Sequence, residues 1–440
     1  MDRRRFLKGG LLASGSILAS ASVPITAIAK SGPRFQGLEG LTGVEASAAI
    51  CRGNDSCVLI EPDVFAKNIK RLKQDIGPDV KLCIVMKSDA YAHGVENLMP
   101  EALRAKPAYI GMVGNNDIRK AVASMDATGM RTSILRIGPA TRFEAAEAVA
   151  NDWPVEELVG SLGQAEMLSR LAHWSADERG STPSLPVHIN IDTGMGRMGF
   201  VRADDIKKAM GLPGIEVRGV MTHYANAYNL EHGEELTRQQ LDKFDAVLSK
   251  LDLPDDVIIH TANSGATLSF PWTRRDMVRV GGAVYGDVPT EMNPGRRYGE
   301  VMSTFLSSVV WVMQVPPNTP VGYDSVYRTP KDRDSILATV KIGYNNGLPS
   351  WAYEKETQVL IRGHRFPVVG KTSMNMVVVD VTGQDEEHKV RLGDEVVIFG
   401  RQGDQEIGWE ELENTTGVST SEITITIGKV NPRIVVRGTD

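Results

Sequence analysis

The feature of this sequence that most constrains its fold is an alternation of short β-rich runs with amphipathic segments over residues 57–290. Helical apolar spacing appears between the runs, for example in residues 234–251. Strands that alternate with helices form parallel sheets, because each helix returns the chain to the start of the next strand. Eight such units in about 230 residues predict a closed (β/α)₈ barrel. The eight runs cover residues 81–86, 108–113, 132–138, 156–162, 186–192, 217–223, 256–262 and 277–286.

The pattern changes near residue 291, where a turn-rich stretch begins. Short strand-like runs separated by Gly and Asn turns follow, with little helical spacing before about residue 409. We therefore predict an α/β chain in which a barrel at residues 57–290 precedes an all-β domain at residues 291–440. Residues 30–56 are interpreted as an extension that could add a strand to the second domain.

The first 29 residues differ from the rest of the chain. A basic start is followed by a short apolar stretch and by Ala-Ile-Ala at residues 27–29, the order of a cleavable signal peptide. The RRRFLK segment at residues 3–8 is similar to twin-arginine signals, which predicts export to the periplasm. The alternative is a membrane anchor, but the apolar stretch is short and diluted by Gly and Ser.

Charge and cysteine content exclude several classes of protein. The formal net charge is −6 and no run of basic residues occurs, which argues against a nucleic-acid partner. Three cysteines are too few for a disulfide scaffold or a zinc cluster, so no metal is expected. Cys51 and Cys57 could pair in an oxidising compartment, which would leave Cys83 free.

Several predicted strands of the barrel end in polar residue types that enzymes use. Lys87 follows the first run, residues 192–197 follow the fifth, His223 ends the sixth, and residues 260–264 end the seventh. Arg279 lies in the eighth run. Each residue alone has a structural explanation, but strand ends in such barrels meet at one mouth, where functional residues cluster.

A lysine at this mouth suggests a Schiff base with a carbonyl compound or with pyridoxal 5′-phosphate (PLP). Burial would lower the pKa of the Lys87 amine and make it nucleophilic. PLP also needs a phosphate site, which barrels place after strands seven and eight. Ser264, Gly281 and Gly282 lie there and offer a hydroxyl and backbone N–H groups.

Two further residues suit the ring of this cofactor. His223 could stack on the pyridine ring, although a single histidine is often structural. Arg279 could donate to the pyridine nitrogen and leave it largely unprotonated, because arginine does not give up its proton. An ion pair elsewhere is the alternative role for Arg279.

Taken together, these segments resemble the alanine racemase family, and within it the periplasmic broad-specificity amino-acid racemases. The resemblance covers residues 57–436. The segments that carry it are VMKSDAYAHG (85–94), IDTGMGRMG (191–199), MTHYAN (221–226), HTANS (260–264), MVRVGGAVYGDVPT (277–290), TPVGYDSVYR (319–328), KIGYNNGLP (341–349) and KTSMNMVVVDVT (371–382).

The resemblance implies roles for further residues. Lys87 would carry PLP and act as one catalytic base, and Tyr91 would bind the phosphate. Arg197 would contact a cofactor oxygen and the substrate carboxylate. Tyr323, in the β domain, would be the second base and would come from the partner subunit of a head-to-tail homodimer.

The β domain would also contribute to the substrate site. Tyr344 would lie at the substrate entrance, and the Met374 N–H would face the substrate carboxylate. Asn375 stands where many alanine racemases have aspartate, which resembles the broad-specificity group.

Other positions depart from the ordinary family pattern. Asn190 replaces a lysine that is often carbamylated, so Arg197 would need another means of orientation, such as a bound anion. Arg136, and Gly428 or Lys429 in place of a phosphate-binding tyrosine, also resemble the broad-specificity group, whereas Met198 resembles ordinary alanine racemases.

The expected activity is PLP-dependent racemisation of free amino acids by two bases, with broad specificity that includes basic amino acids. A dedicated alanine racemase is the nearest alternative, and a PLP barrel decarboxylase is a further one. A non-catalytic PLP carrier is disfavoured, because such a protein would lack the tyrosine-bearing β domain.

Overall fold

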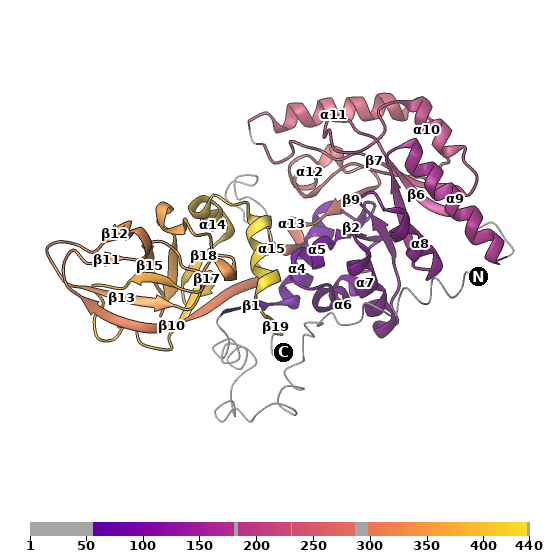
Figure 1. The fold of residues 1–440 in the computed structure, drawn as a ribbon. Coiled ribbons are helices and arrows are strands. Elements are labelled where there is room, and N and C mark those ends of the chain that lie inside the picture. The colour runs from indigo at the N-terminus through magenta and orange to yellow at the C-terminus, as the bar shows by residue number, and fades with distance from the viewer. Residues whose placement is uncertain (1–55, 180–183, 230, 287–297, 438–440) are drawn as a thin grey trace. The chain divides into compact units, whose positions relative to one another are not determined.

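A computed structural model describes residues 56–179, 184–229, 231–286 and 298–437 of the chain. The predicted signal peptide (1–29), residues 30–55 of the predicted extension, Cys51 and the predicted boundary near residue 291 lie outside these residues. The described chain contains a barrel followed by a β domain (Figure 1).

Eight parallel strands form the barrel sheet, in the order β8-β7-β6-β5-β4-β3-β2-β9. Two backbone bonds bring β9 against the end of β8: Asp276 N–H donates to Ile259 and Arg279 N–H donates to Ala262, each at 3.0 Å. The strands are β2 Lys81–Val85, β3 Tyr109–Met112, β4 Ser133–Arg136, β5 Val155–Val159, β6 Leu185–Asn190, β7 Ile215–Met221, β8 Ile258–His260 and β9 Met277–Val280. Every run predicted as a barrel strand overlaps one of them, although β5, β6 and β7 begin one or two residues before the predicted runs.

Helices alternate with these strands and lie outside them in Figure 1. Helix α4 shows why they form: Pro62 opens it, and Phe65, Ile69 and Leu72 bury one face at helical spacing. The helices of the barrel are α4 Pro62–Ile76, α5 Lys87–Tyr91, α6 Val95–Arg104, α7 Asn115–Thr128, α8 Arg142–Ala150, α9 Leu162–Arg179, α10 Ala203–Met210, α11 Gly233–Leu248, α12 Ser264–Ser269 and α13 Gly282–Tyr285. The alternation confirms the predicted (β/α)₈ barrel.

The last predicted strand was too long. The run at 277–286 holds β9 only as far as Val280, and α13 begins at Gly282. Two adjacent glycines favour such a break, and the Gly281 N–H donates to the Ser264 hydroxyl rather than to a neighbouring strand.

The β domain confirms the predicted all-β architecture after the barrel. Its described strands form a sheet ordered β18-β17-β14-β15-β16-β13-β10-β1-β19, and β10 also pairs with β17, which folds the sheet back on itself. A small separate hairpin joins β11 to β12. The strands are β1 Ser56–Ile60, β10 Ser303–Val315, β11 Pro320–Val321, β12 Tyr327–Arg328, β13 Ser335–Val340, β14 Gln358–Ile361, β15 His364–Val369, β16 Val377–Asp380, β17 Glu395–Gln402, β18 Gln405–Ile407 and β19 Arg433–Val435. Helices α14 Trp409–Thr416 and α15 Thr420–Val430 precede β19.

Strand β1 precedes the barrel in sequence but pairs with β10 and with β19 of the β domain. Cys57 in this strand is disulfide-bonded, whereas Cys83 in β2 is a free, buried thiol. Among the residues that the structure describes, no helix combines the length and apolar character needed to cross a membrane.

Candidate active site

The carboxyl ends of the barrel strands bring together most of the predicted barrel residues. Lys87 lies two residues beyond β2, His223 two residues beyond β7, and Ser264 opens α12 after β8. Arg279 lies within β9, and Gly281 follows the end of that strand. Because parallel strands end on one side of a barrel, these residues share a rim.

The segment after Lys87 has an unusual backbone. Residues 88–92 all have φ between 54° and 64°, although none is glycine. Two backbone bonds close this left-handed turn: Ala90 N–H donates to Met86 at 3.0 Å, and Ala92 N–H donates to Ser88 at 2.9 Å. Left-handed geometry costs ~1–2 kcal/mol for each such residue. The turn therefore persists only if its surroundings stabilise it.

The Lys87 side chain is half-buried at the start of this turn. Its burial, together with the nearby charge of Arg197, lowers the pKa of the amine. A larger fraction of the amine is therefore neutral near pH 7 than for a lysine in water, and a neutral amine is the nucleophilic form. The ammonium nitrogen lies 6.0 Å from the centre of the Tyr91 ring.

A small polar cradle lies where α12, α13 and the left-handed turn meet. The Gly281 N–H donates to the Ser264 Oγ at 3.0 Å. A Cβ at position 281 would collide with the Tyr91 hydroxyl, so only glycine lets that hydroxyl approach the backbone. Tyr285 supports Tyr91 from behind, with ring centres 4.7 Å apart. Gly282, which follows, begins α13.

His223 and Arg279 lie side by side, with the Arg279 Nη2 3.4 Å from the His223 Nδ1. Arg279 is almost fully buried and donates to the carbonyls of His260 and Thr222 at 2.9 and 2.7 Å. Burial lowers the pKa of Arg279 to about 10, so it remains charged at neutral pH. Burial, followed by the charges of Arg279, Arg197 and Lys87, lowers the pKa of His223 to about 3. His223 is therefore neutral.

A chain of buried polar groups continues from Arg279 into the barrel. Arg279 lies 3.1 Å from the His260 Nδ1, and His260 Nε2 lies 2.7 Å from His188 Nδ1. His188 Nε2 lies 2.9 Å from Glu156, which also accepts from the Tyr109 hydroxyl at 3.0 Å. Sequence reasoning missed His188 and Glu156. Their signal was an ionisable side chain inside a barrel strand, His188 in β6 and Glu156 in β5.

Arg197 lies in an exposed loop after β6. One carboxylate oxygen of Asp192 accepts the N–H groups of Gly194, Met195 and Gly196, which fixes the first half of the loop. The buried Asn190 donates to the Met198 carbonyl at 2.8 Å, next to Arg197. The Asn190 side chain thus supports the loop by bonding to the loop backbone, and Asn190 stands at the position that the resemblance assigns to a lysine often carbamylated in the family.

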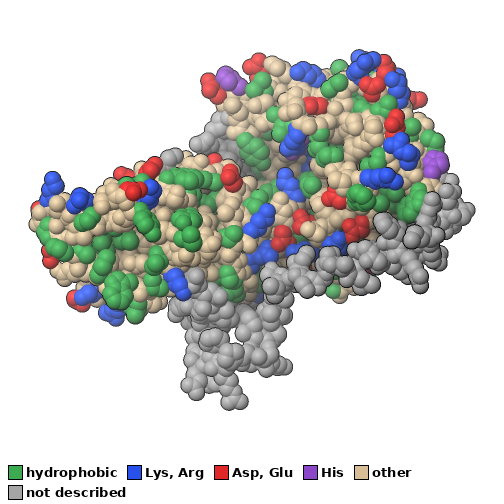
Figure 2. Space-filling model, in the orientation of Figure 1, with side chains coloured by type: hydrophobic (Ala, Val, Ile, Leu, Met, Phe, Trp, Pro, Cys, Tyr) green, Lys and Arg blue, Asp and Glu red, His purple; other side chains and the backbone are tan. Residues whose placement is uncertain are grey.

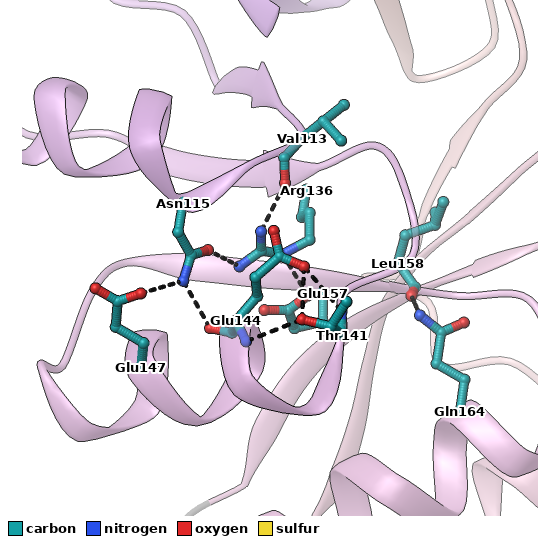
Figure 3. Close-up of polar contacts among 9 residues, drawn as sticks. All are labelled: Val113, Asn115, Arg136, Thr141, Glu144, Glu147, Glu157, Leu158 and Gln164. Atoms are coloured by element: carbon teal, nitrogen blue, oxygen red, sulfur yellow. Dashed lines mark hydrogen bonds and ion pairs between the residues drawn. The ribbon is translucent and has the colours of Figure 1, made fainter. Parts of the chain in front are cut away.

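A second buried arginine joins three neighbouring strands (Figure 3). Arg136, at the end of β4, is fully buried and donates to Glu157 at 2.7 Å and to the Val113 carbonyl at 2.6 Å. Its third bond goes to the side-chain oxygen of Asn115 at 2.8 Å, and Asn115 in turn donates to Glu147 at 2.8 Å. This arginine fixes the ends of β3, β4 and β5 relative to α7 and α8.

The remaining predicted residues form a separate group on the β domain. The Tyr344 N–H donates to the Ser373 carbonyl at 3.2 Å, so the Tyr344 and Met374 loops are adjacent. Tyr323 is 67% exposed, and Tyr344 and Met374 are 47% and 55% exposed. Asn375 is also exposed. The single chain therefore presents these side chains to solvent and does not pack Tyr323 against Lys87.

The barrel residues fit PLP. Lys87 offers an amine of lowered pKa to the aldehyde. The Ser264 hydroxyl, the Tyr91 hydroxyl and the backbone at Gly281 form a cradle that a side chain at position 281 would fill, and hydroxyl and N–H groups of this kind suit a phosphate. The neutral His223 and the buried Arg279 suit the ring and its nitrogen.

The buried histidine of the lysine segment gives a prediction for acid stability. Burial lowers the pKa of His93 from 6.5 to about 4, so between these values the unfolded chain binds more protons than the folded chain. The contribution of His93 to stability is complete above pH 6.5 and is lost as the pH falls, by roughly 2 kcal/mol at pH 5. The melting temperature of a His93→Gln variant should therefore decrease less between pH 7 and pH 5 than that of the wild type.

His232, which is exposed, provides the matched control. A His232→Gln variant should follow the wild-type melting curves at both pH values. Equal acid sensitivity of the wild type and of His93→Gln would contradict the assignment of a neutral, buried imidazole to His93.

Comparison with known proteins assigns the chain to a family. Residues 60–289 match the family model of the alanine racemase N-terminal domain, and residues 302–435 match that of the alanine racemase C-terminal domain. A lysine racemase of Proteus mirabilis is 33% identical over 390 residues, which cover 87% of this chain and 90% of the relative. A broad specificity amino-acid racemase of Aeromonas hydrophila is 36% identical over 387 residues, 86% of this chain and 89% of the relative.

A solved structure supports the same assignment. The crystal structure of alanine racemase from Bartonella henselae with covalently bound pyridoxal phosphate superposes with a TM-score of 0.74 at 25% identity, covering 87% of this chain and 99% of that one. Family models, relatives and structure together span both parts of the described chain. The chain therefore belongs to the alanine racemase family and is a PLP-dependent amino-acid racemase.

Proposed function

We propose that this racemase acts on a broad range of free amino acids, including basic ones, and that Lys87 and Tyr323 are its two bases. The observation that carries the catalytic part is the half-buried Lys87 amine of lowered pKa beside a polar cradle and a neutral histidine. Broad specificity is supported by Asn375 and Asn190, which depart from the ordinary alanine racemase pattern, and by the names of the relatives.

The barrel residues bind and orient the cofactor. When bound, PLP acidifies the Cα–H of the amino acid attached to it. Lys87 would hold the aldehyde carbon, and Tyr91, Ser264 and the N–H groups near Gly281 and Gly282 would hold the phosphate. Arg279, still protonated at neutral pH, would donate to the pyridine nitrogen and could not protonate it fully.

Two residues would move the proton. Lys87, on one face of the substrate, takes the Cα proton from one enantiomer or returns a proton to form it. Tyr323 does the same on the opposite face. A free tyrosine has a pKa of ~10, so Tyr323 needs positive charge or hydrogen bonds in the assembled site to act as a base. Arg197, beside Lys87, is a source of positive charge at the rim.

Tyr323 would come from the partner subunit of a head-to-tail homodimer. Its exposure in the single chain supports this arrangement, as does an accumulation of exposed apolar side chains on the β domain. Figure 2 shows hydrophobic side chains on the visible face of that domain. The exposed ones in the β domain include Trp311, Met313, Val326, Trp351 and Met376. Such surfaces mark protein interfaces more often than open solvent faces.

Substrate range is tested by incubating the purified protein with L-lysine, L-arginine and L-alanine and separating the enantiomers by chiral chromatography. We expect D-lysine and D-arginine to form at rates comparable to D-alanine. Turnover of alanine alone would refute broad specificity. It would favour a dedicated alanine racemase, the enzyme class whose sequence pattern Met198 matches. Release of carbon dioxide in place of the D-isomer would contradict racemisation itself.

A further inference from the structure

The left-handed turn at residues 88–92 is held by parts of the chain far away in sequence. Helix α15 and strand β19, which lie at the C-terminal end of the β domain, both contact this turn. Gly428 of α15 lies so close that a Cβ there would come within 2.5 Å of the Ala92 carbonyl oxygen. The end of the β domain is thus packed directly against the segment that carries Lys87 and Tyr91.

The central contact is an ion pair between Asp89 and Arg433. One nitrogen of the Arg433 guanidinium lies 2.5 Å from the Asp89 carboxylate, and the two side chains are only 15% and 19% exposed. The same nitrogen donates to the Ala92 carbonyl at 3.0 Å. Arg433 therefore joins the second and the fifth residue of the left-handed turn with one group.

The Asp89 carboxylate also collects bonds from the barrel. It accepts from the Val95 N–H at 3.1 Å and from the Lys120 ammonium at 2.9 Å. Burial alone would raise the pKa of Asp89, but the bonds from Arg433 and Lys120 outweigh it and lower the pKa to about 2. The Asp89 N–H donates to the Asp117 carboxylate at 3.0 Å, so the backbone of the turn is fixed as well.

We propose that Arg433 and Asp89 are positioning residues, which keep the turn at residues 88–92 in its left-handed form and so hold the Lys87 amine and the Tyr91 hydroxyl in the geometry that binds PLP. The proposal rests on the proposed role of Lys87. Lys87 immediately precedes the turn and Tyr91 lies within it, so a relaxation of these five backbones toward ordinary φ values would move both groups. A guanidinium that joins the second and the fifth residue of the turn opposes that relaxation.

A second ion pair between the same regions provides a matched control. Arg437, four residues after Arg433, donates to Glu101 of α6 at 2.9 Å. It joins the end of the β domain to the barrel but does not touch the turn. If Arg433 served only to attach one region to the other, Arg433→Met and Arg437→Met would have similar effects.

The test uses the full-length protein, prepared with and without PLP. The first measurement is the dissociation constant for PLP, from an absorbance titration of the PLP-free protein. The second is the pH midpoint for labelling of Lys87 by an amine-specific reagent in the PLP-free protein, read by peptide mapping. We expect Arg433→Met to weaken PLP binding about tenfold or more and to shift the labelling midpoint upward toward that of a lysine in water. Arg437→Met should leave the dissociation constant for PLP within about twofold of the wild-type value and should not shift the labelling midpoint.

The conservative variant separates positioning from bulk stability. Because one nitrogen makes both contacts of Arg433, Arg433→Lys should recover part of the PLP affinity and part of the lowered midpoint. Asp89→Asn should resemble Arg433→Met, and these two variants replace Arg433→Met if it does not fold. The proposal is overturned if the Arg433 and Arg437 variants change affinity and midpoint equally, or if Arg433→Met lowers only the melting temperature.

A Lys87→Ala variant distinguishes a failure of the positioning role from a failure of the proposed role of Lys87. If Lys87→Ala still formed a covalent PLP adduct, the role of Lys87 would be wrong whatever the Arg433 variants did. If Lys87→Ala lost the adduct while Arg433→Met behaved like Arg437→Met, the positioning role alone would be wrong.

Discussion

A Lys87→Ala variant is expected to lose racemase activity by about 10³-fold or more, because it would remove both the proposed general base and the group proposed to hold the cofactor. The half-buried amine has a lowered pKa because of burial and the nearby Arg197, so alanine offers no substitute at that point of the rim. The measurement is the initial rate of D-enantiomer formation from L-lysine and L-alanine, together with the absorbance band of the bound cofactor.

Lys81, at the exposed start of β2, the strand that precedes Lys87, is the control for this prediction. Lys81→Ala should keep both the rate and the absorbance band. A Lys87→Ala protein that racemises at more than a tenth of the wild-type rate would show that another amine performs the chemistry.

A Tyr323→Phe variant is expected to lower racemisation by about 10² to 10⁴-fold while leaving PLP binding intact. Phenylalanine keeps the ring but removes the hydroxyl, and no contact of Tyr323 with the barrel cradle is required for PLP to bind. Tyr327→Phe is the matched control, since Tyr327 lies four residues away and its hydroxyl donates to Asp380 at 3.3 Å within the β domain. Equal rates for the two variants would remove Tyr323 from the mechanism.

Mixing the two inactive proteins tests where Tyr323 acts. In the proposed head-to-tail dimer each site would take Lys87 from one subunit and the partner subunit's Tyr323. A mixed dimer of Lys87→Ala and Tyr323→Phe chains therefore contains one complete site and one site without either base. After subunit exchange, roughly a quarter of wild-type activity should return. No recovery, with mixed dimers demonstrated by a tag on one chain, would place both bases in one subunit.

The architecture could be predicted because the hydrophobic pattern is repeated and local. Each barrel strand is a short apolar run followed by a helix with a buried face, so all eight strands were located, and the β domain was recognised from its short strands and turns. The predicted end of the last barrel strand was wrong. The strand stops at Val280, and the next residue, Gly281, contacts Ser264, a contact that no local pattern encodes.

The candidate site could be predicted only in part. The expectation that functional residues lie at the carboxyl ends of barrel strands located Lys87, His223, Ser264 and Arg279, because parallel strands end at one rim. It could not predict the left-handed turn, since residues 88–92 contain no glycine to indicate it. Nor could it predict Arg433, whose contact with Asp89 joins positions separated by 344 residues. Such contacts follow from the packing of the two regions.

The most direct test of the account is to identify the residue that carries PLP. The purified protein is loaded with PLP, reduced with borohydride and digested, and the modified peptide is sequenced by mass spectrometry. We expect a single reduced adduct on Lys87, in the peptide that also contains Tyr91. An adduct on any other lysine, or a protein that binds PLP without a reducible adduct, would contradict it.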